Sequence, residues 1–121
     1  MYQVKFETIV INGADYTIRS LQDRQQFHDP EQTAEMMGIS SATWALFGNI
    51  WPSGLILADI MSTYKVDGLN VLEVGCGLGI ASLIVNNRGA QHTASDYHPM
   101  AEGFLLENTR LNELPPMHFE R

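Results

Sequence analysis

Residues 71–79 read Val-Leu-Glu-Val-Gly-Cys-Gly-Leu-Gly, and this stretch decides the fold. A short apolar run carries one acid and leads into glycines at every second position. Glycine has no Cβ, so such a loop permits both a tight strand-to-helix turn and the close approach of a bound molecule. We therefore predict a strand over residues 70–74, followed directly by a ligand-binding glycine loop.

The residues after this loop show the pattern of a βαβ unit. Residues 78–88 are predominantly apolar and helical in character and end at Gly89, and residues 91–95 predict a second strand that leads directly to Asp96. This acid follows the glycines by about 20 residues, the spacing at which a carboxylate of a nucleotide-binding fold meets ribose hydroxyls. We expect an adenosyl ligand at this site.

Two further elements complete the pattern towards the end of the chain. Pro99 predicts the first position of a helix over residues 99–112, and residues 117–119 resemble the start of a third strand. Alternating strands and helices predict an α/β fold with a Rossmann-like parallel sheet and helices on both faces. With about three strands the sheet is incomplete, so we expect the front part of a longer domain.

The first 50 residues carry a different pattern. Asn12-Gly13 separates two β-rich runs, and both residues of such a turn take positive φ, so we predict a β-hairpin over residues 3–20. Asp29-Pro30 predicts the cap and first position of a short helix ending at Gly38. Ser53 predicts the N-cap of another helix with a broad apolar face.

Composition narrows the classes of function. The 121 residues fit one domain, with 45% hydrophobic and 17% charged residues. The net charge is −7 and the basic residues are scattered, which argues against nucleic-acid binding. Cys76 is the single cysteine, so no internal disulfide can form, and we expect a cytoplasmic protein with no membrane segment and no metal site.

The glycine spacing discriminates between ligand classes. A dinucleotide fingerprint needs glycine at position 80, where Ile80 stands, and a phosphate loop needs a Lys that is absent nearby. Pyrophosphate binding is thus disfavoured, although an NAD(P)-type oxidoreductase fragment stays open as an alternative.

The acid, the three alternating glycines and the second acid together resemble class I (seven-β-strand) S-adenosylmethionine-dependent methyltransferases. The segments 51–54 and 108–112 make the chain similar to the protein-lysine methyltransferase branch. The resemblance implies that S-adenosylmethionine is the cofactor, that Asp96 holds its ribose, and that Trp51 borders its methionyl end. The implied cofactor-binding residues are Trp51, Glu73, Gly75, Cys76, Gly77, Gly79 and Asp96.

The resemblance implies a two-part organisation and a reaction. Residues 1–50 form an N-terminal hairpin with a helical extension, and residues 51–121 form the cofactor-binding half of a methyltransferase domain. The implied function is methyl transfer to a protein side chain, with the catalytic residues unknown. A non-catalytic module that binds a partner, or associates with itself through an exposed sheet edge, stays open. Asp96 as a turn acid and Trp51 as core filler are the plainer interpretations.

Overall fold

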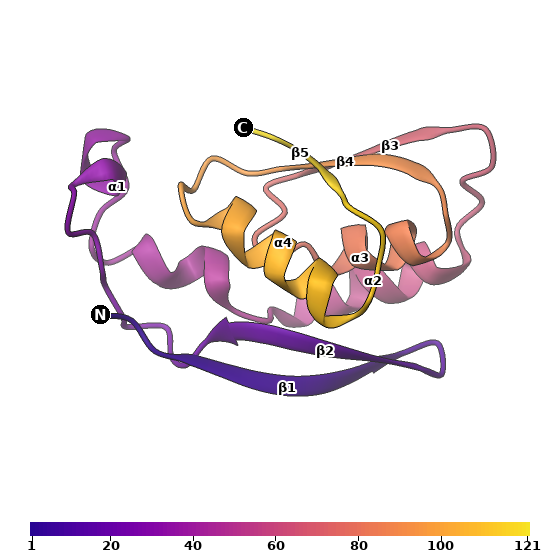
Figure 1. Cartoon of the computed structure of the whole chain (residues 1–121), viewed down its shortest axis with the longest axis horizontal. Helices are drawn as coiled ribbons and strands as arrows, with labels where there is room; N and C mark the ends of the chain where they lie inside the picture. The colour runs from indigo at the N-terminus through magenta and orange to yellow at the C-terminus, as the bar shows by residue number, and fades with distance from the viewer.

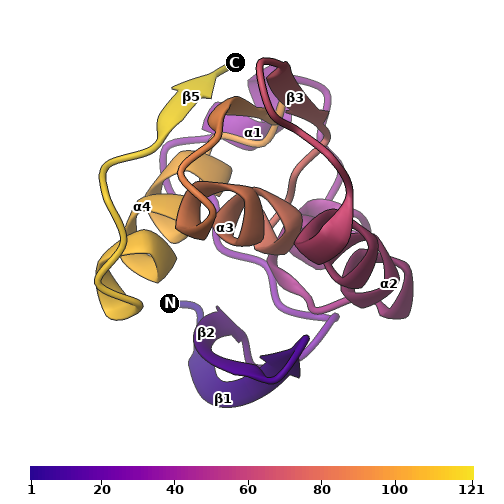
Figure 2. The ribbon, with the colours of Figure 1, turned by 90° about the vertical axis from the view of Figure 1, so that its right-hand side faces the viewer.

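The computed structural model describes residues 1–121 and shows three layers. A parallel sheet forms one layer, the longer helices form the middle layer, and the hairpin forms the third (Figures 1 and 2). In chain order the elements are β1 (Val4–Ile11), β2 (Ala14–Leu21), α1 (Thr33–Met36), the 3-10 helix η1 (Trp44–Gly48), α2 (Pro52–Thr63), β3 (Asn70–Val74), α3 (Ile80–Asn87), β4 (Gln91–Ser95), α4 (Ala101–Leu111) and β5 (His118–Glu120).

The parallel sheet has the order β3-β4-β5, with β4 in the centre. Each new strand is added on the same side of the previous one. Right-handed crossovers that advance in one direction place their helices on one face, so α3 and α4 lie together beneath the sheet (Figure 2). The predicted incomplete parallel sheet is confirmed, and helices α2, α3 and α4 cover one of its faces.

The opposite face of the sheet is not covered by these helices. Leu72 and Val74 of β3 are 60% and 76% exposed there. Strand β3 also has one unpaired edge, because it pairs only with β4. Helices on this second face would require strands added beyond β3, so the expectation of helices on both faces is met on one face only.

The predicted hairpin is confirmed. Strands β1 and β2 pair antiparallel from Val4↔Leu21 to Ile11↔Ala14. Asn12 and Gly13 have φ of 49° and 80°, the positive values that a two-residue turn requires.

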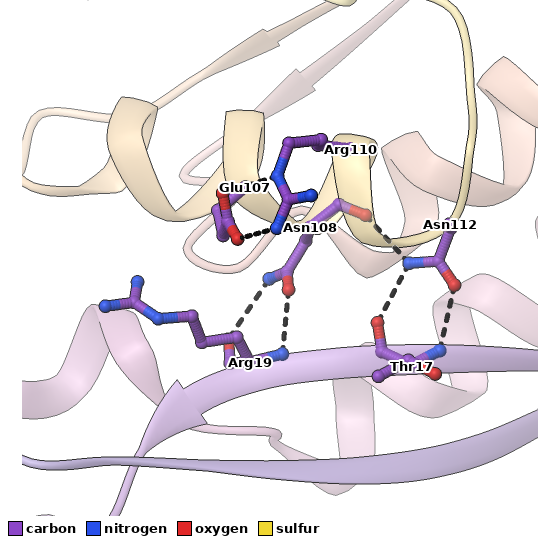
Figure 3. Close-up of polar contacts among 6 residues, drawn as sticks. All are labelled: Thr17, Arg19, Glu107, Asn108, Arg110 and Asn112. Carbon is purple, nitrogen blue, oxygen red and sulfur yellow. Dashed lines mark hydrogen bonds and ion pairs between the residues drawn. The ribbon is translucent and has the colours of Figure 1, made fainter.

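The outer edge of β2 is bonded to side chains of α4 and of its C-cap residue instead of to another strand (Figure 3). Asn108 accepts the N–H of Arg19 at 2.7 Å and donates to its carbonyl at 3.1 Å. Asn112, one turn later, accepts the N–H of Thr17 at 2.8 Å and donates to its carbonyl at 2.8 Å. These two amides satisfy backbone groups that a strand edge would otherwise leave unpaired.

Four helix starts differ from the prediction. Helix α3 begins at Ile80 and not at residue 78, because Gly79, with φ of 71°, is its N-cap. Helix α1 begins at Thr33 and not at Pro30, because the Asp29 carboxylate accepts the N–H groups of Ala34 and Glu35, both at 3.0 Å. The helix that does end before Gly38 is therefore shorter than expected.

The other two differences concern α2 and α4. The N-cap of α2 is Trp51 and not Ser53, since Pro52 already occupies the first helical position. Helix α4 begins at Ala101 and not at Pro99, because a hydrogen-bonded turn holds the preceding residues.

Residues 1–50 and 51–121 share a single hydrophobic core. One cluster of 19 buried residues includes Trp44 and Phe47 from the first range and Leu83, Phe104 and Leu105 from the second. The apolar face of α2 is largely exposed, because only Ala58 of that helix is buried. The longest helix has 12 residues, and none has the length and hydropathy that a bilayer crossing requires.

Candidate functional site: a cavity at the carboxyl end of β3

The glycine loop connects β3 to α3 through three residues of left-handed backbone. Gly75, Gly77 and Gly79 have φ of 63°, 55° and 71°, values that other L-residues rarely adopt. The loop is fixed internally, since the Cys76 N–H donates to the Ser95 carbonyl at 2.8 Å and the Gly79 N–H donates to the Cys76 carbonyl at 2.8 Å. The conformation therefore depends on glycine at all three positions.

Close packing adds a second requirement at two of these glycines. A Cβ on Gly77 would lie 2.9 Å from the backbone oxygen of Phe47, and one on Gly79 would collide with the side chain of Leu105. A Cβ on Gly75 would meet no atom within 4 Å, and this residue lines the cavity described below. Gly75 is therefore the position where the backbone itself faces open space.

Asp96 holds the loop from the end of β4. One carboxylate oxygen accepts the Gly77 N–H at 2.7 Å, and the other accepts the His98 N–H at 2.8 Å. A carboxylate offers about four acceptor positions, so each oxygen of Asp96 retains one for another donor. The side chain can thus serve the turn and a ligand diol together, which reconciles the two interpretations of this acid.

Glu73 lies in β3 and caps α3. Its Oε1 accepts both the Ser82 N–H at 3.0 Å and the Ser82 hydroxyl at 2.6 Å. Burial raises the pKa of Glu73, the two bonds from Ser82 oppose that increase, and the nearby Asp96 charge adds to it. Both bonds go to Oε1, so Glu73 fixes the start of α3 and retains Oε2 for a ligand.

A cavity of about 580 Å³ brings the predicted residues together. This volume lies within the range of about 300–1,000 Å³ that small-molecule sites have. All seven residues predicted to bind a cofactor line it: Trp51, Glu73, Gly75, Cys76, Gly77, Gly79 and Asp96. The cavity lies beyond the carboxyl end of β3, where open α/β sheets bind ligands.

Part of the cavity wall comes from residues that the sequence did not indicate. Ile39, Thr43, Leu46, Phe47 and Asn49 line it from the segment that contains η1. These residues belong to the range 1–50, which we had expected to be an extension. No periodicity or motif in that segment indicates a ligand.

Tyr97 and His98 also line the cavity and were likewise missed as ligand-facing residues. The Tyr97 hydroxyl donates to the Met37 carbonyl at 2.7 Å and so ties the segment after α1 to the site. His98 stacks on Phe47 with ring centroids 4.0 Å apart, and its Nδ1 accepts the Met100 N–H at 3.0 Å. Burial lowers the pKa of His98, which favours the neutral ring that this bond needs.

The thiol of Cys76 is buried and unreactive. Burial, followed by the charges of Glu73 and Asp96, raises its pKa to about 12. A thiolate is the nucleophilic form, so this thiol stays protonated at neutral pH and fills space between the glycines. The described residues contain no group of three or more His, Cys, Asp or Glu side chains placed to hold a metal ion.

Solved structures establish the class of fold. A protein from Streptococcus mutans described as an S-adenosylmethionine-dependent methyltransferase matches 99% of this chain with a TM-score of 0.60 at 15% identity, over 26% of its own length. A tRNA (uracil-54, C5)-methyltransferase of Pyrococcus abyssi in complex with S-adenosyl-L-homocysteine matches 95% of the chain with a TM-score of 0.53 at 17% identity, over 23% of its own length. The fold is that of the S-adenosylmethionine-dependent methyltransferases.

Curated sequences confirm the resemblance to this class and to its protein-lysine branch. The chain is 33% identical over 93 residues to the electron transfer flavoprotein beta subunit lysine methyltransferase of Xenopus laevis, covering 74% of this chain and 36% of the relative. It is 36% identical over 78 residues to the protein-lysine methyltransferase METTL21E of Bos taurus, covering 61% and 27%. The chain thus spans about a third of the length of these relatives. No protein-family profile matches it.

Proposed function

We propose that this chain binds S-adenosylmethionine and forms the cofactor site of a methyltransferase that acts on protein side chains. One observation carries the proposal: a single cavity gathers the glycine loop with the free acceptor positions of Asp96 and Glu73. The dinucleotide alternative lacks a comparable observation, since Ile80 begins α3 where a pyrophosphate fingerprint needs glycine.

Three groups at the cavity match parts of this ligand. The remaining acceptor positions of Asp96 suit the two ribose hydroxyls. The free oxygen of Glu73 suits a donor such as the ammonium group of the methionyl end. The open space at Gly75 allows the chain of the ligand to pass close to the backbone.

The protein's part in the reaction is placement and exclusion of water. When bound, the cofactor supplies a methyl group activated by the sulfonium, and an acceptor nucleophile displaces S-adenosylhomocysteine in line. Residues of the cavity wall hold the donor in one orientation, which lowers the entropic cost of the encounter. No side chain at the cavity presents an activated base, so we assign no catalytic residue.

A protein acceptor is favoured by charge and by the relatives. The net charge of −7 suits a cationic lysine-bearing surface and opposes a polyanion. Two of the relatives are protein-lysine methyltransferases. A third, from Protochlamydia amoebophila, is described as an RNA methyltransferase and is 35% identical over 57 residues, covering 47% of this chain and 13% of the relative. We place the protein acceptor first.

The test is a calorimetric titration of the chain, and of any longer version of it, with S-adenosylhomocysteine, S-adenosylmethionine and NAD. We expect both adenosyl ligands to bind and NAD to be ignored. Asp96→Ala should weaken binding by roughly 1–3 kcal/mol, the range of charge-assisted hydrogen bonds. Asp59→Asn, an exposed acid on α2, is the matched control and should leave affinity unchanged. Binding of NAD alone would refute the proposal.

Turnover separates the enzyme from the non-catalytic alternative. Incubation with labelled S-adenosylmethionine and either basic proteins or RNA should label protein only. If every version of the chain bound the ligand but transferred no methyl group, the protein would be a binding module and not an enzyme. Methyl transfer to RNA alone would favour an RNA acceptor over a protein acceptor.

A further inference from the structure

Arg24 lies behind one wall of the cavity without a carboxylate partner. Its guanidinium carbon is 4.6 Å from the centroid of the Trp51 ring, over which it stacks. Trp51 lines the cavity, and its indole N–H donates to the Leu46 carbonyl at 3.0 Å, which fixes the ring by its edge. The salt bridges of the molecule are Lys5–Glu7, Arg110–Glu107 and His118–Glu120, so Arg24 takes part in none.

Other arginines of the chain are engaged elsewhere. Arg88 donates to the carbonyls of Met61 and Tyr64, both at 2.7 Å. Arg19 stacks on Phe104, and neither residue lines the cavity. Arg24 is therefore the cation that the fold places at the Trp51 wall, in a chain with twice as many acids as basic residues.

The cavity consequently has two electrostatically different walls. Asp96 lies at the end of β4 and supplies negative charge. Trp51 lies at the N-terminus of α2, where the first peptide N–H groups of a 12-residue helix contribute partial positive charge. Arg24 adds a full positive charge on that same side, so an anionic part of a ligand is favoured there.

Stacking leaves the hydrogen-bonding edges of Arg24 free. A guanidinium that lies over an aromatic ring interacts through its face, while its five N–H groups point outward in its own plane. A carboxylate beyond the edge of the indole can accept from two of them. Even without direct contact, a charge within about 8 Å acts on a carboxylate at physiological ionic strength.

We propose that Arg24 recognises the α-carboxylate of the S-adenosyl ligand past the edge of the Trp51 ring. This inference rests on the proposed function and names the residue that discriminates ligands with an amino acid end from ligands without one. With the ribose at Asp96, Arg24 also sets which way the ligand lies in the cavity.

The experiment compares two ligands that differ in the part that Arg24 is proposed to recognise. S-adenosylhomocysteine carries the carboxylate, and 5′-methylthioadenosine lacks the whole amino acid end. Both are titrated into the wild-type chain, Arg24→Gln, Arg24→Lys and the control Arg110→Gln, which removes a remote exposed arginine. We expect Arg24→Gln to weaken the binding of S-adenosylhomocysteine about 5- to 20-fold and that of 5′-methylthioadenosine less than about twofold.

Two further readouts distinguish charge recognition from support of Trp51. Arg24→Lys should recover part of the lost affinity, since it restores the charge. Raising NaCl from about 50 to about 500 mM should weaken the binding of S-adenosylhomocysteine to the wild type and to Arg110→Gln. The same change should weaken its binding to Arg24→Gln much less. Equal weakening of both ligands in Arg24→Gln, or no weakening of either, overturns the inference. Failure of both ligands to bind the wild type overturns the proposed function and this inference with it.

Discussion

Replacing Asn108 by alanine should destabilise the fold by about 2–4 kcal/mol, although this residue does not line the cavity. The side chain is fully buried and makes two bonds to the backbone of Arg19, at 2.7 and 3.1 Å (Figure 3). Each bond contributes about 0.5–1.5 kcal/mol net, and leaving a desolvated backbone group unpaired costs about 1–3 kcal/mol. The truncation removes both bonds and leaves both backbone groups without a partner.

Asn108→Asp makes a sharper version of the same test. The carboxylate still accepts the Arg19 N–H but faces the Arg19 carbonyl with an oxygen instead of a donor. Burial and this carbonyl raise the pKa of the introduced acid above its unfolded value. A raised pKa gives stability that is complete below the unfolded pKa and lost as pH rises through the folded pKa. The variant should therefore approach the wild type near pH 4 and fall behind it towards pH 7.

The assay is urea unfolding followed by circular dichroism and tryptophan fluorescence, with amide hydrogen exchange at Thr17 and Arg19. Glu102→Gln, on the same helix and exposed, is the control and should leave the unfolding midpoint unchanged. An Asn108→Ala variant within about 0.5 kcal/mol of the wild type, with unchanged exchange at Arg19, would refute the reasoning.

Three further predictions concern the loop and the open edge of the sheet. The wild type should gain stability relative to Glu73→Gln as pH falls from 7 to 5 in urea titrations, because a raised pKa favours folding at the acidic side; an unchanged difference would contradict this. Gly79→Ala should destabilise the fold more than Gly75→Ala, because both incur about 1–2 kcal/mol of left-handed strain but only the former collides with Leu105; equal unfolding energies would count against the packing argument. The unpaired edge of β3 should cause self-association that Leu72→Lys suppresses, and a wild type that sediments as a monomer at every concentration would exclude it.

The strands were predictable from sequence because their signals are local. Residues 70–74 and 91–95 match β3 and β4, since an apolar or β-prone run bounded by glycine or an acid leaves little freedom at either end. The hairpin followed from Asn12-Gly13, whose φ values are both positive. In each case the deciding residues are neighbours in the chain.

The predicted helix starts are wrong because a capping side chain can lie several residues away from the amides that it accepts. Asp29 caps α1 from outside the helix, five and six residues before the amides that it accepts. Asp96, for which the sequence leaves both a ligand role and a turn role open, holds the turn that precedes α4. Sequence identifies such acids as caps or ligands but not the partner that each one takes.

The sequence indicated which motif residues would lie together, but not the residues that form the rest of the cavity wall. The seven motif residues share one cavity, but Phe47 and Tyr97 enter it through packing between segments far apart in the sequence. In the sequence, Asn108 is marked only by the family resemblance of residues 108–112. Its pairing with Arg19 spans 89 residues and has no local signature.

Helix α4 connects the stability of the hairpin to the geometry of the loop. Leu105 packs under Gly79, and Phe104 meets Phe47 edge-to-face with centroids 5.1 Å apart, one turn from Asn108. An Asn108→Ala change that loosens α4 should therefore also weaken the binding of S-adenosylhomocysteine, so that affinity and the free energy of unfolding fall together. Asp96→Asn should lower affinity with a much smaller loss of stability, because an amide oxygen still accepts one of the two loop N–H groups. If Asn108→Ala lost stability and kept full affinity, the loop would be held by Asp96 alone and α4 would serve only the hairpin.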